Sequence, residues 1–167
     1  MVACSGQQDR EPADLRSPRE IRENRIEAQR DFLERENASI ESYIADRGFS
    51  MQRSGTGIYY QIEPDSLTGA TASEGDRVVY HYEVYLLNGE KIYSSGGRPA
   101  QLRVDREDAI IGLHEALKKL SVGQKGRFII PSHLAYGVAG DQQKVPPLTA
   151  LQYNLELLAI NPKQSKK

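Results

Sequence analysis

A run of alternating side chains between residues 76 and 89 constrains the fold of this chain more than any other feature. Every second residue on one side of the run is apolar or aromatic: Val78, Tyr80, Tyr82, Val84 and Leu86. A period of two predicts a β-strand with one buried face. The run ends at Asn88-Gly89, a dipeptide that strongly indicates a hairpin turn. The chain is therefore expected to return through residues 90–94 as a second, antiparallel strand.

Three further segments complete the expected domain. Residues 124–130 predict a strand with Phe128 and Ile130 inward, and residues 151–157 alternate between apolar and polar side chains. Residues 108–120 predict a short helix with four aliphatic side chains on one face: Ile110, Leu113, Leu117 and Leu120. Antiparallel strands with one helix on one face define an α+β fold. We therefore expect an antiparallel β-sheet wrapped around one short helix.

A long charged helix is expected ahead of this domain, over residues 17–48. Ser17 is a suitable N-cap, Pro18 suits the first helical position, and Glu20 completes a Ser-x-x-Glu capping box. Gly48 is expected to end the helix, because glycine readily adopts the left-handed conformation found there.

Apolar side chains form only a thin stripe on this helix, where Ile26, Leu33 and Ile40 recur every seven residues. Three interpretations are compatible with the stripe. It pairs with a second copy of the chain to form a homodimer, it lies against its own domain, or it belongs to a solvated spacer helix.

These patterns divide the chain into five segments. Residues 1–16 form a charged tether, and residues 17–48 form the helix. Two short strands and a linker are expected over residues 49–71, followed by the main domain over residues 72–160. Residues 161–167 form a basic tail.

The composition argues against several classes of function. The chain has 22 Lys and Arg against 23 Asp and Glu, a net charge of −1, so we expect no nucleic-acid partner. Its three histidines, His81, His114 and His133, are scattered, so we expect no metal site. A Walker loop, a dinucleotide-binding fingerprint and a Gly-x-Ser-x-Gly elbow are all missing, which argues against a kinase or a hydrolase. No run approaches the roughly 18 apolar residues of a membrane span.

The only cysteine, Cys4, follows Val2-Ala3 and precedes Ser5, as at the end of a bacterial lipobox. In that motif the cysteine becomes the lipidated first residue of the mature protein. The sequence has no hydrophobic leader before Cys4, so this interpretation expects the natural precursor to begin further upstream. The alternative is that Cys4 is an incidental thiol near the end of the chain.

Four ordered blocks of the sequence resemble blocks of the FKBP-type peptidyl-prolyl cis–trans isomerases. They resemble, in order, the opening hairpin, the helix with its following turn, the next strand with its Tyr-Gly loop, and the Pro-Pro turn with the closing strand. The blocks are residues 78–95, 110–125, 130–137 and 145–158. The resemblance implies an FKBP-like fold over residues 72–160. It also implies isomerisation of X–Pro bonds in proline-containing polypeptides, without a cofactor.

The same resemblance implies roles for individual residues. In the catalytic set of Tyr82, Ile110 and Tyr136, the Ile110 N–H would bind one substrate carbonyl and the Tyr136 hydroxyl another. The prolyl ring would bind among a further set of side chains: Ile92, Tyr93, Leu113, Val145 and Tyr153. None of these groups has to ionise, because the reaction needs only a rotation about the amide bond.

Several positions depart from the family pattern. Leu113 stands where a tryptophan usually forms the pocket floor, and Tyr93 stands where an aspartate usually supports the cleft. Ala100 replaces an aromatic residue, and Asp141 and Lys144 replace apolar groups on the loop over the site. We therefore predict weak catalysis, an altered peptide preference and poor affinity for the macrolide inhibitors of the family.

A narrower resemblance concerns the N-terminal half of the chain. The charged helix, the strand pair around Gly55-Thr56-Gly57 and the lipobox-like Cys4 are together similar to gliding-motility-associated lipoprotein isomerases of the Bacteroidetes. This similarity implies a lipid-anchored protein of the bacterial cell envelope, periplasmic or at the surface, that assists the folding of exported proteins. The departures at Tyr93, Ala100 and Lys144 favour an alternative, a catalytically poor FKBP-like binding module or a chaperone subunit of an envelope complex.

Overall fold

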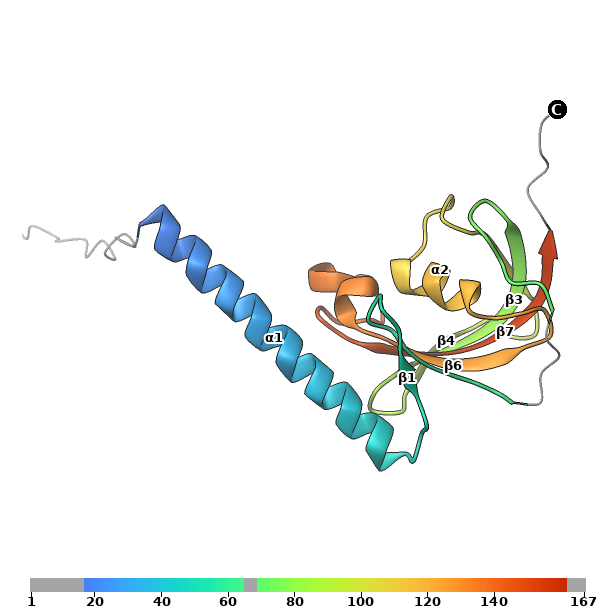
Figure 1. Cartoon of the computed structure of the whole chain (residues 1–167), viewed down its shortest axis with the longest axis horizontal. Helices are drawn as coiled ribbons and strands as arrows, with labels where there is room; N and C mark the ends of the chain where they lie inside the picture. The colour runs from blue at the N-terminus through green and yellow to red at the C-terminus, as the bar shows by residue number, and fades with distance from the viewer. Residues whose placement is uncertain (1–16, 65–68, 162–167) are drawn as a thin grey trace, which may run out of the picture. The chain divides into compact units, whose positions relative to one another are not determined.

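The computed structural model of this chain describes residues 17–64 and 69–161 and contains two α-helices and seven β-strands (Figure 1). In chain order the elements are α1 (Pro18–Asp46), β1 (Gln52–Arg53), β2 (Tyr59–Ile62), β3 (Arg77–Leu86), β4 (Lys91–Ser94), β5 (Ala100–Arg103), α2 (Ile111–Lys118), β6 (Lys125–Ile130), the 3-10 turns η1 (Ser132–Leu134) and η2 (Gly137–Ala139), and β7 (Leu151–Asn161).

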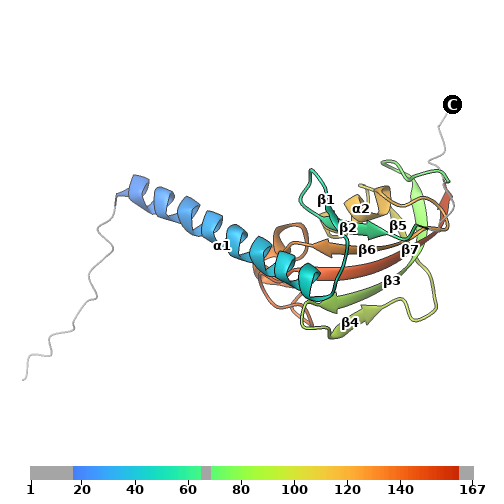
Figure 2. The same ribbon diagram turned by 60° about the horizontal axis from the view of Figure 1, so that its bottom comes forward.

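The seven strands form one antiparallel sheet in the order β1-β2-β6-β7-β3-β4, with β5 also paired to β3. Figure 2 shows β6, β7, β3 and β4 side by side. The predicted hairpin joins β3 to β4, and the predicted last strand, β7, lies between β3 and β6. Figure 1 shows the sheet curving around α2, so the expected α+β architecture is confirmed.

The main core lies between α2 and the sheet face that carries it, which we call the inner face. Leu113, Leu117 and Leu120 pack there with Phe128 and Ile130 of β6. The close approach of helix and sheet depends on Gly112, because a Cβ at this position would overlap the Ile130 side chain. Glycine thus fixes the distance between the start of α2 and β6.

A smaller core lies on the opposite, outer face of the sheet. Ile40 and Tyr43 of α1 pack there with Tyr59, Ile129 and Ala150. The Tyr43 hydroxyl also donates a hydrogen bond of 2.9 Å to Oε1 of Gln152. The last turns of α1 therefore lie against their own domain.

The start of α1 follows its predicted capping box. The Ser17 N–H donates to Oε2 of Glu20 at 2.7 Å, and the Glu20 N–H donates to Oγ of Ser17 at 3.2 Å. The division between the two compact units of the chain falls further along the helix, between Arg35 and Glu36. Before this division the stripe residue Ile26 is 54% exposed.

The structure corrects three expectations of local structure. Helix α2 begins at Ile111 rather than at residue 108, because Ile110 has an extended conformation with φ −63° and ψ 140°. The short strand β5 has no clear alternation and was not expected. Gln152, expected on the polar face of the last strand, is buried, and its amide accepts a hydrogen bond from Tyr43. Cys4, the tether and the tail after residue 161 lie outside the described residues.

Candidate active site

A pocket of about 630 Å³ opens on the inner face of the sheet. Four strands, β3, β4, β5 and β7, contribute to its lining together with α2 and the loop after β6. The lining residues are Tyr80, Tyr82, Val84, Tyr93, Ala100, Leu113, Tyr136, Asp141, Gln143 and Tyr153. Most of the residues in this lining are aromatic or aliphatic, and Asp141 is the only ionisable one among them other than the phenols.

Strand geometry brings the phenols together. Tyr80 and Tyr82 alternate along β3, so their rings share the inner face, with centroids 6.0 Å apart. On the neighbouring strand β7, Tyr153 pairs directly with Val84 of β3. Tyr136 joins them from the irregular segment between η1 and η2, where its φ is −96° and its ψ is 3°. Residues 73 positions apart along the chain thus meet in one pocket.

Burial keeps these phenols in the protonated form. Desolvation raises the pKa of Tyr80 to about 12, with smaller contributions from Tyr82, Glu107 and Tyr136. Desolvation also raises the pKa of Tyr153, and the neighbouring phenol of Tyr136 adds to the effect. The pKa of Tyr136 is raised first by burial and then by the negative charge of Asp141. All three hydroxyls therefore remain possible hydrogen-bond donors at neutral pH.

The structure brings five of the eight predicted site residues into the lining: Tyr82, Tyr93, Leu113, Tyr136 and Tyr153. The other three predicted residues, Ile92, Ile110 and Val145, do not line the pocket. Ile92 and Val145 are buried in the main core, at 5% and 3% exposure. Ile110 is the N-cap residue of α2 and packs partly buried against the same core.

The backbone of Ile110 has one further relevant property. Among residues 17–64 and 69–161, no group accepts a hydrogen bond from the Ile110 N–H, whereas its carbonyl accepts one from the Leu113 N–H. This donor stands at the start of α2, ahead of Gly112 and Leu113, which pack against β6. It is therefore available to an external acceptor.

Five lining residues were not among the predicted site residues. Ala100 and Asp141 were considered only as departures from the family pattern. Tyr80 and Val84 share the alternation of Tyr82 and were interpreted only as the buried face of a strand. Gln143 lies in an irregular loop without any periodic signal. The period-two pattern of β3 was sufficient to place Tyr80 beside Tyr82, whereas no local signal places Gln143.

The hydroxyl of Tyr93 compensates in part for the aspartate expected at its position. It donates a hydrogen bond to Oδ2 of Asp141, on the loop that follows η2. On the same loop, Nζ of Lys144 donates to the carbonyl of Ile92 at 3.0 Å. A carboxylate is therefore present beside the pocket, but it comes from the loop rather than from the hairpin.

A second hollow, of about 620 Å³, lies on the outer face of the sheet and has a different character. Several of its polar side chains have partners of their own, inside the lining or beside it. Lys125 lies 3.8 Å from Glu156, Glu83 pairs with Lys91, and Nδ1 of His81 hydrogen-bonds to Oγ of Ser95. Among the described residues that line this hollow Tyr82 is the single aromatic one, so several rings do not gather here as they do in the first pocket.

The described part of the chain offers few other functional features. No group of three or more His, Cys, Asp or Glu side chains in residues 17–64 and 69–161 is placed to hold a metal ion. Within the same residues, neither helix has the length and apolar character needed to cross a membrane.

Known proteins with similar sequences share this domain. FK506-binding protein 1 of Kluyveromyces lactis is 43% identical over 89 residues, which cover 52% of this chain and 78% of the relative. The FKBP-type peptidyl-prolyl cis-trans isomerase FkpA of Escherichia coli is 33% identical over 124 residues, which cover 73% of this chain but only 44% of the relative.

Solved structures extend the similarity to the fold. A peptidyl-prolyl cis-trans isomerase from Pseudomonas syringae superposes with a TM-score of 0.67 at 27% identity, covering 80% of this chain and 96% of that one. The FkpA structure from Escherichia coli also gives 0.67, at 29% identity, covering 89% of this chain and 75% of that one. The family model for FKBP-type peptidyl-prolyl cis-trans isomerases matches residues 69–158, more than half of the sequence. The chain therefore belongs to the FKBP-type peptidyl-prolyl cis–trans isomerase family.

Proposed function

We propose that the pocket on the inner face is the active site, where the enzyme isomerises X–Pro bonds of polypeptide substrates. The observation that carries this proposal is the gathering of five phenols around one hollow: Tyr80, Tyr82, Tyr93, Tyr136 and Tyr153. The activity is assigned to residues 72–160, which include all of them.

The physical basis of catalysis is the weakening of amide resonance. An X–Pro bond isomerises over tens of seconds because resonance raises a barrier of about 18–20 kcal/mol. The planar amide is more strongly charge-separated than the twisted one. A water-poor aromatic pocket therefore stabilises the twisted amide relative to the planar one, and well-placed donors hold it in place.

Two donors are assigned to the bound peptide. The Ile110 N–H, without an acceptor among the described residues, binds one substrate carbonyl, and the Tyr136 hydroxyl binds another. Tyr82 completes the catalytic set. Ile92, Tyr93, Leu113, Val145 and Tyr153 are assigned to prolyl binding, with Ile92 and Val145 acting from behind the lining as buried supports.

Turnover is expected to be weak. Leu113 and Ala100 line the pocket with aliphatic groups where the family usually has large aromatic ones. These replacements reduce the area that packs against the prolyl ring, so both substrates and macrolide inhibitors are expected to bind less tightly.

A protease-coupled assay on short Xaa-Pro peptides tests this proposal. We expect measurable acceleration by the wild-type protein, a large loss in Tyr82→Ala and a smaller loss in Tyr136→Phe. Acceleration by the wild-type protein that both variants retain in full would rule out this pocket as the site of catalysis.

A location in the bacterial cell envelope is also proposed, with exported proteins as the substrates. It rests on the lipobox-like sequence around Cys4, whose lipidation would attach the protein to a membrane. Mass spectrometry of the protein purified from its own cells tests this assignment. A diacylglycerol-modified cysteine is expected, and an unmodified thiol in the mature protein would contradict it.

A role as a binding module or chaperone subunit is the second candidate. Three exposed aliphatic side chains favour it: Ile111 at 60%, Val138 at 79% and Leu148 at 44% exposure. Each is close in sequence to a proposed site residue, so they are suited to holding unfolded segments. Suppression of aggregation that survives in Tyr82→Ala, while isomerisation is lost, would show that both roles exist.

A homodimer through the N-terminal helix is proposed as well. The exposed Ile26 belongs to the apolar stripe of α1 and is a candidate contact. Analytical ultracentrifugation of the wild-type chain and of Ile26→Asp tests this idea. A dimer that dissociates in the variant is expected, whereas a monomeric wild-type chain would refute it.

A further inference from the structure

Asp141 carries the only carboxylate in the lining of the proposed active site. Its Oδ2 accepts a hydrogen bond from the Tyr93 hydroxyl, and its Oδ1 accepts bonds from the N–H groups of Gln143 (2.9 Å) and Val145 (2.7 Å). All three donors are neutral. They orient the carboxylate but leave its negative charge uncompensated.

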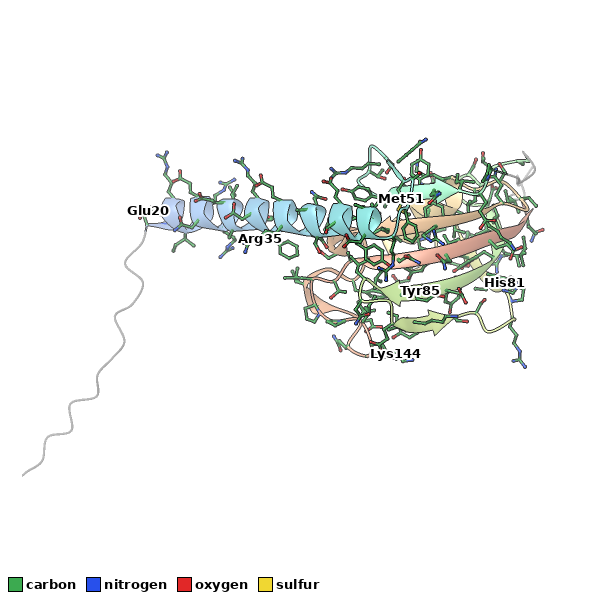
Figure 3. All side chains as sticks on the ribbon, turned by 90° about the horizontal axis from the view of Figure 1, so that it is seen from below. Glu20, Arg35, Met51, His81, Tyr85 and Lys144 are labelled. Atoms are coloured by element: carbon green, nitrogen blue, oxygen red, sulfur yellow. The ribbon has the colours of Figure 1, made fainter. Side chains whose placement is uncertain are left out.

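No cation within residues 17–64 and 69–161 forms an ion pair with Asp141. The adjacent Lys144 is directed elsewhere. Its Nζ donates to the carbonyl of Ile92 and lies 5.3 Å from the centre of the Tyr93 ring. Figure 3 shows Lys144 beside β4, where this contact is made.

The loop that carries Asp141 is closed by its own hydrogen bonds. The Asp141 N–H donates to the Val145 carbonyl at 3.2 Å, while the Val145 N–H donates back to the Asp141 side chain. Gly140, at φ 64°, lets the chain approach the Val145 carbonyl so closely that a Cβ there would overlap it. The carboxylate is thus held in position before any substrate binds.

The charge persists at neutral pH. Desolvation opposes ionisation, but the hydrogen bonds from Tyr93 and from the backbone of Val145, Gln143 and Lys144 outweigh it and lower the pKa of Asp141. An ionised carboxylate held in a fixed orientation at the pocket attracts a cation that approaches it, with the modest strength and salt sensitivity of an ion pair near the surface.

We propose that Asp141 is a specificity-determining residue, selecting polypeptide segments with a lysine or arginine adjacent to the isomerised proline. The inference rests on the proposed function of the pocket. The ammonium or guanidinium group of the substrate supplies the partner that Asp141 lacks within the described chain. An acidic residue at the same place is repelled.

The test compares peptides that differ only in the residue before proline, Ala-Xaa-Pro-Phe with Xaa as lysine, arginine, leucine or glutamate. Exchange NMR gives the catalysed cis–trans rate without a protease, and titration gives the affinity of each peptide. For the wild-type protein we expect the lysine and arginine peptides to exceed the glutamate peptide about fivefold in catalytic efficiency at low salt. The ratio should shrink as salt is added.

Asp141→Asn is the informative variant, because the amide oxygen still accepts from the N–H groups of Gln143 and Val145 while the negative charge is removed. The amide NH2 then faces the Tyr93 hydroxyl, which can accept a hydrogen bond from it. We expect it to reduce the ratio between lysine and glutamate peptides to less than about twofold. Glu74→Gln is the matched control, since Glu74 pairs with Arg106 outside the pocket and its loss changes the net charge equally. The control should keep the wild-type ratio.

The possible outcomes separate two failures. If the wild-type protein isomerises all four peptides equally, or if Asp141→Asn keeps the preference, the specificity inference is wrong while the proposed function stands. If the wild-type protein neither binds nor isomerises any of the peptides, the proposed function of the pocket is wrong and the inference is overturned with it.

Discussion

The hydroxyl of Tyr93 donates a hydrogen bond to the carboxylate of Asp141, 48 positions later in the chain. The bond joins β4 to the loop after η2 across the mouth of the pocket. An aspartate at position 93 would place its charge on the hairpin itself. In this protein the hairpin instead carries the phenol of Tyr93, and the carboxylate comes from Asp141 on the loop after η2.

Tyr93→Phe removes this donor while keeping the ring. The folded protein loses one hydrogen bond to a charged acceptor, so we expect the free energy of unfolding to fall. The loop should also lose order, which would lower the preference for cationic peptides. Urea denaturation and the peptide series measure the two effects, and a variant unchanged in both would show that the bond contributes nothing.

Gly112→Ala tests how closely α2 approaches the sheet. The added methyl group overlaps the side chain of Ile130, so we expect a loss of about 1–3 kcal/mol of stability from overpacking. Gly55→Ala is the matched control, because a Cβ at that position meets no atom within 4 Å. Equal stability of the two variants in urea denaturation would contradict the packing described for α2.

Ile40→Ala tests the attachment of the last turns of α1 to the outer face. Ile40 is fully buried, so its truncation should destabilise the protein by about 2–4 kcal/mol. Ile26→Ala, on the same helix at 54% exposure, should change stability by less than about 0.5 kcal/mol. Both variants should retain the isomerase activity of the wild-type protein, because neither residue lines the pocket. A smaller effect at Ile40 than at Ile26 would refute the assigned packing.

The buried phenol of Tyr80 should make the free energy of unfolding depend on pH in the alkaline range. Its pKa is about 12 in the folded protein, against an ordinary value of 10.0, so the folded state binds the phenolic proton more tightly than the unfolded state does. The contribution of this phenol to the free energy of unfolding is fully present below about pH 10 and is lost as the pH rises through 12. By pH 11 the loss is about 1 kcal/mol.

Urea denaturation at pH 8 and pH 11 checks this dependence. The loss of stability between the two values should be about 1 kcal/mol smaller in Tyr80→Phe than in the wild-type protein. An identical loss in both proteins would show that the Tyr80 phenol is not buried as described.

The sequence was most informative where structure depends on neighbours along the chain. The alternation around Tyr82, the turn at Asn88-Gly89 and the capping box of Ser17 and Glu20 all reflect local geometry, and all were predicted. The α+β fold followed because the strands and the helix could be identified separately and the family blocks gave their order.

Features that depend on distant contacts were less accessible. No local pattern indicates that Tyr43 covers the amide of Gln152, since these residues are 109 positions apart. The pairing of β5 with β3 was not predicted because β5 has a single buried side chain, Leu102, and therefore shows no alternating pattern. The contact between Tyr93 and Asp141 likewise requires the folded loop, so the sequence suggested only that a carboxylate had been lost.

The central claim is that a prolyl ring binds among the phenols of the inner face. The most direct measurement is a two-dimensional amide NMR titration of the wild-type chain with an Ala-Lys-Pro-Phe peptide. We predict chemical-shift changes centred on Tyr82, Ile110, Leu113, Tyr136 and Tyr153, together with faster cis–trans exchange of the peptide. Shift changes centred instead on the polar outer face, around His81, Arg127 and Asn154, with the phenols unaffected, would contradict the account.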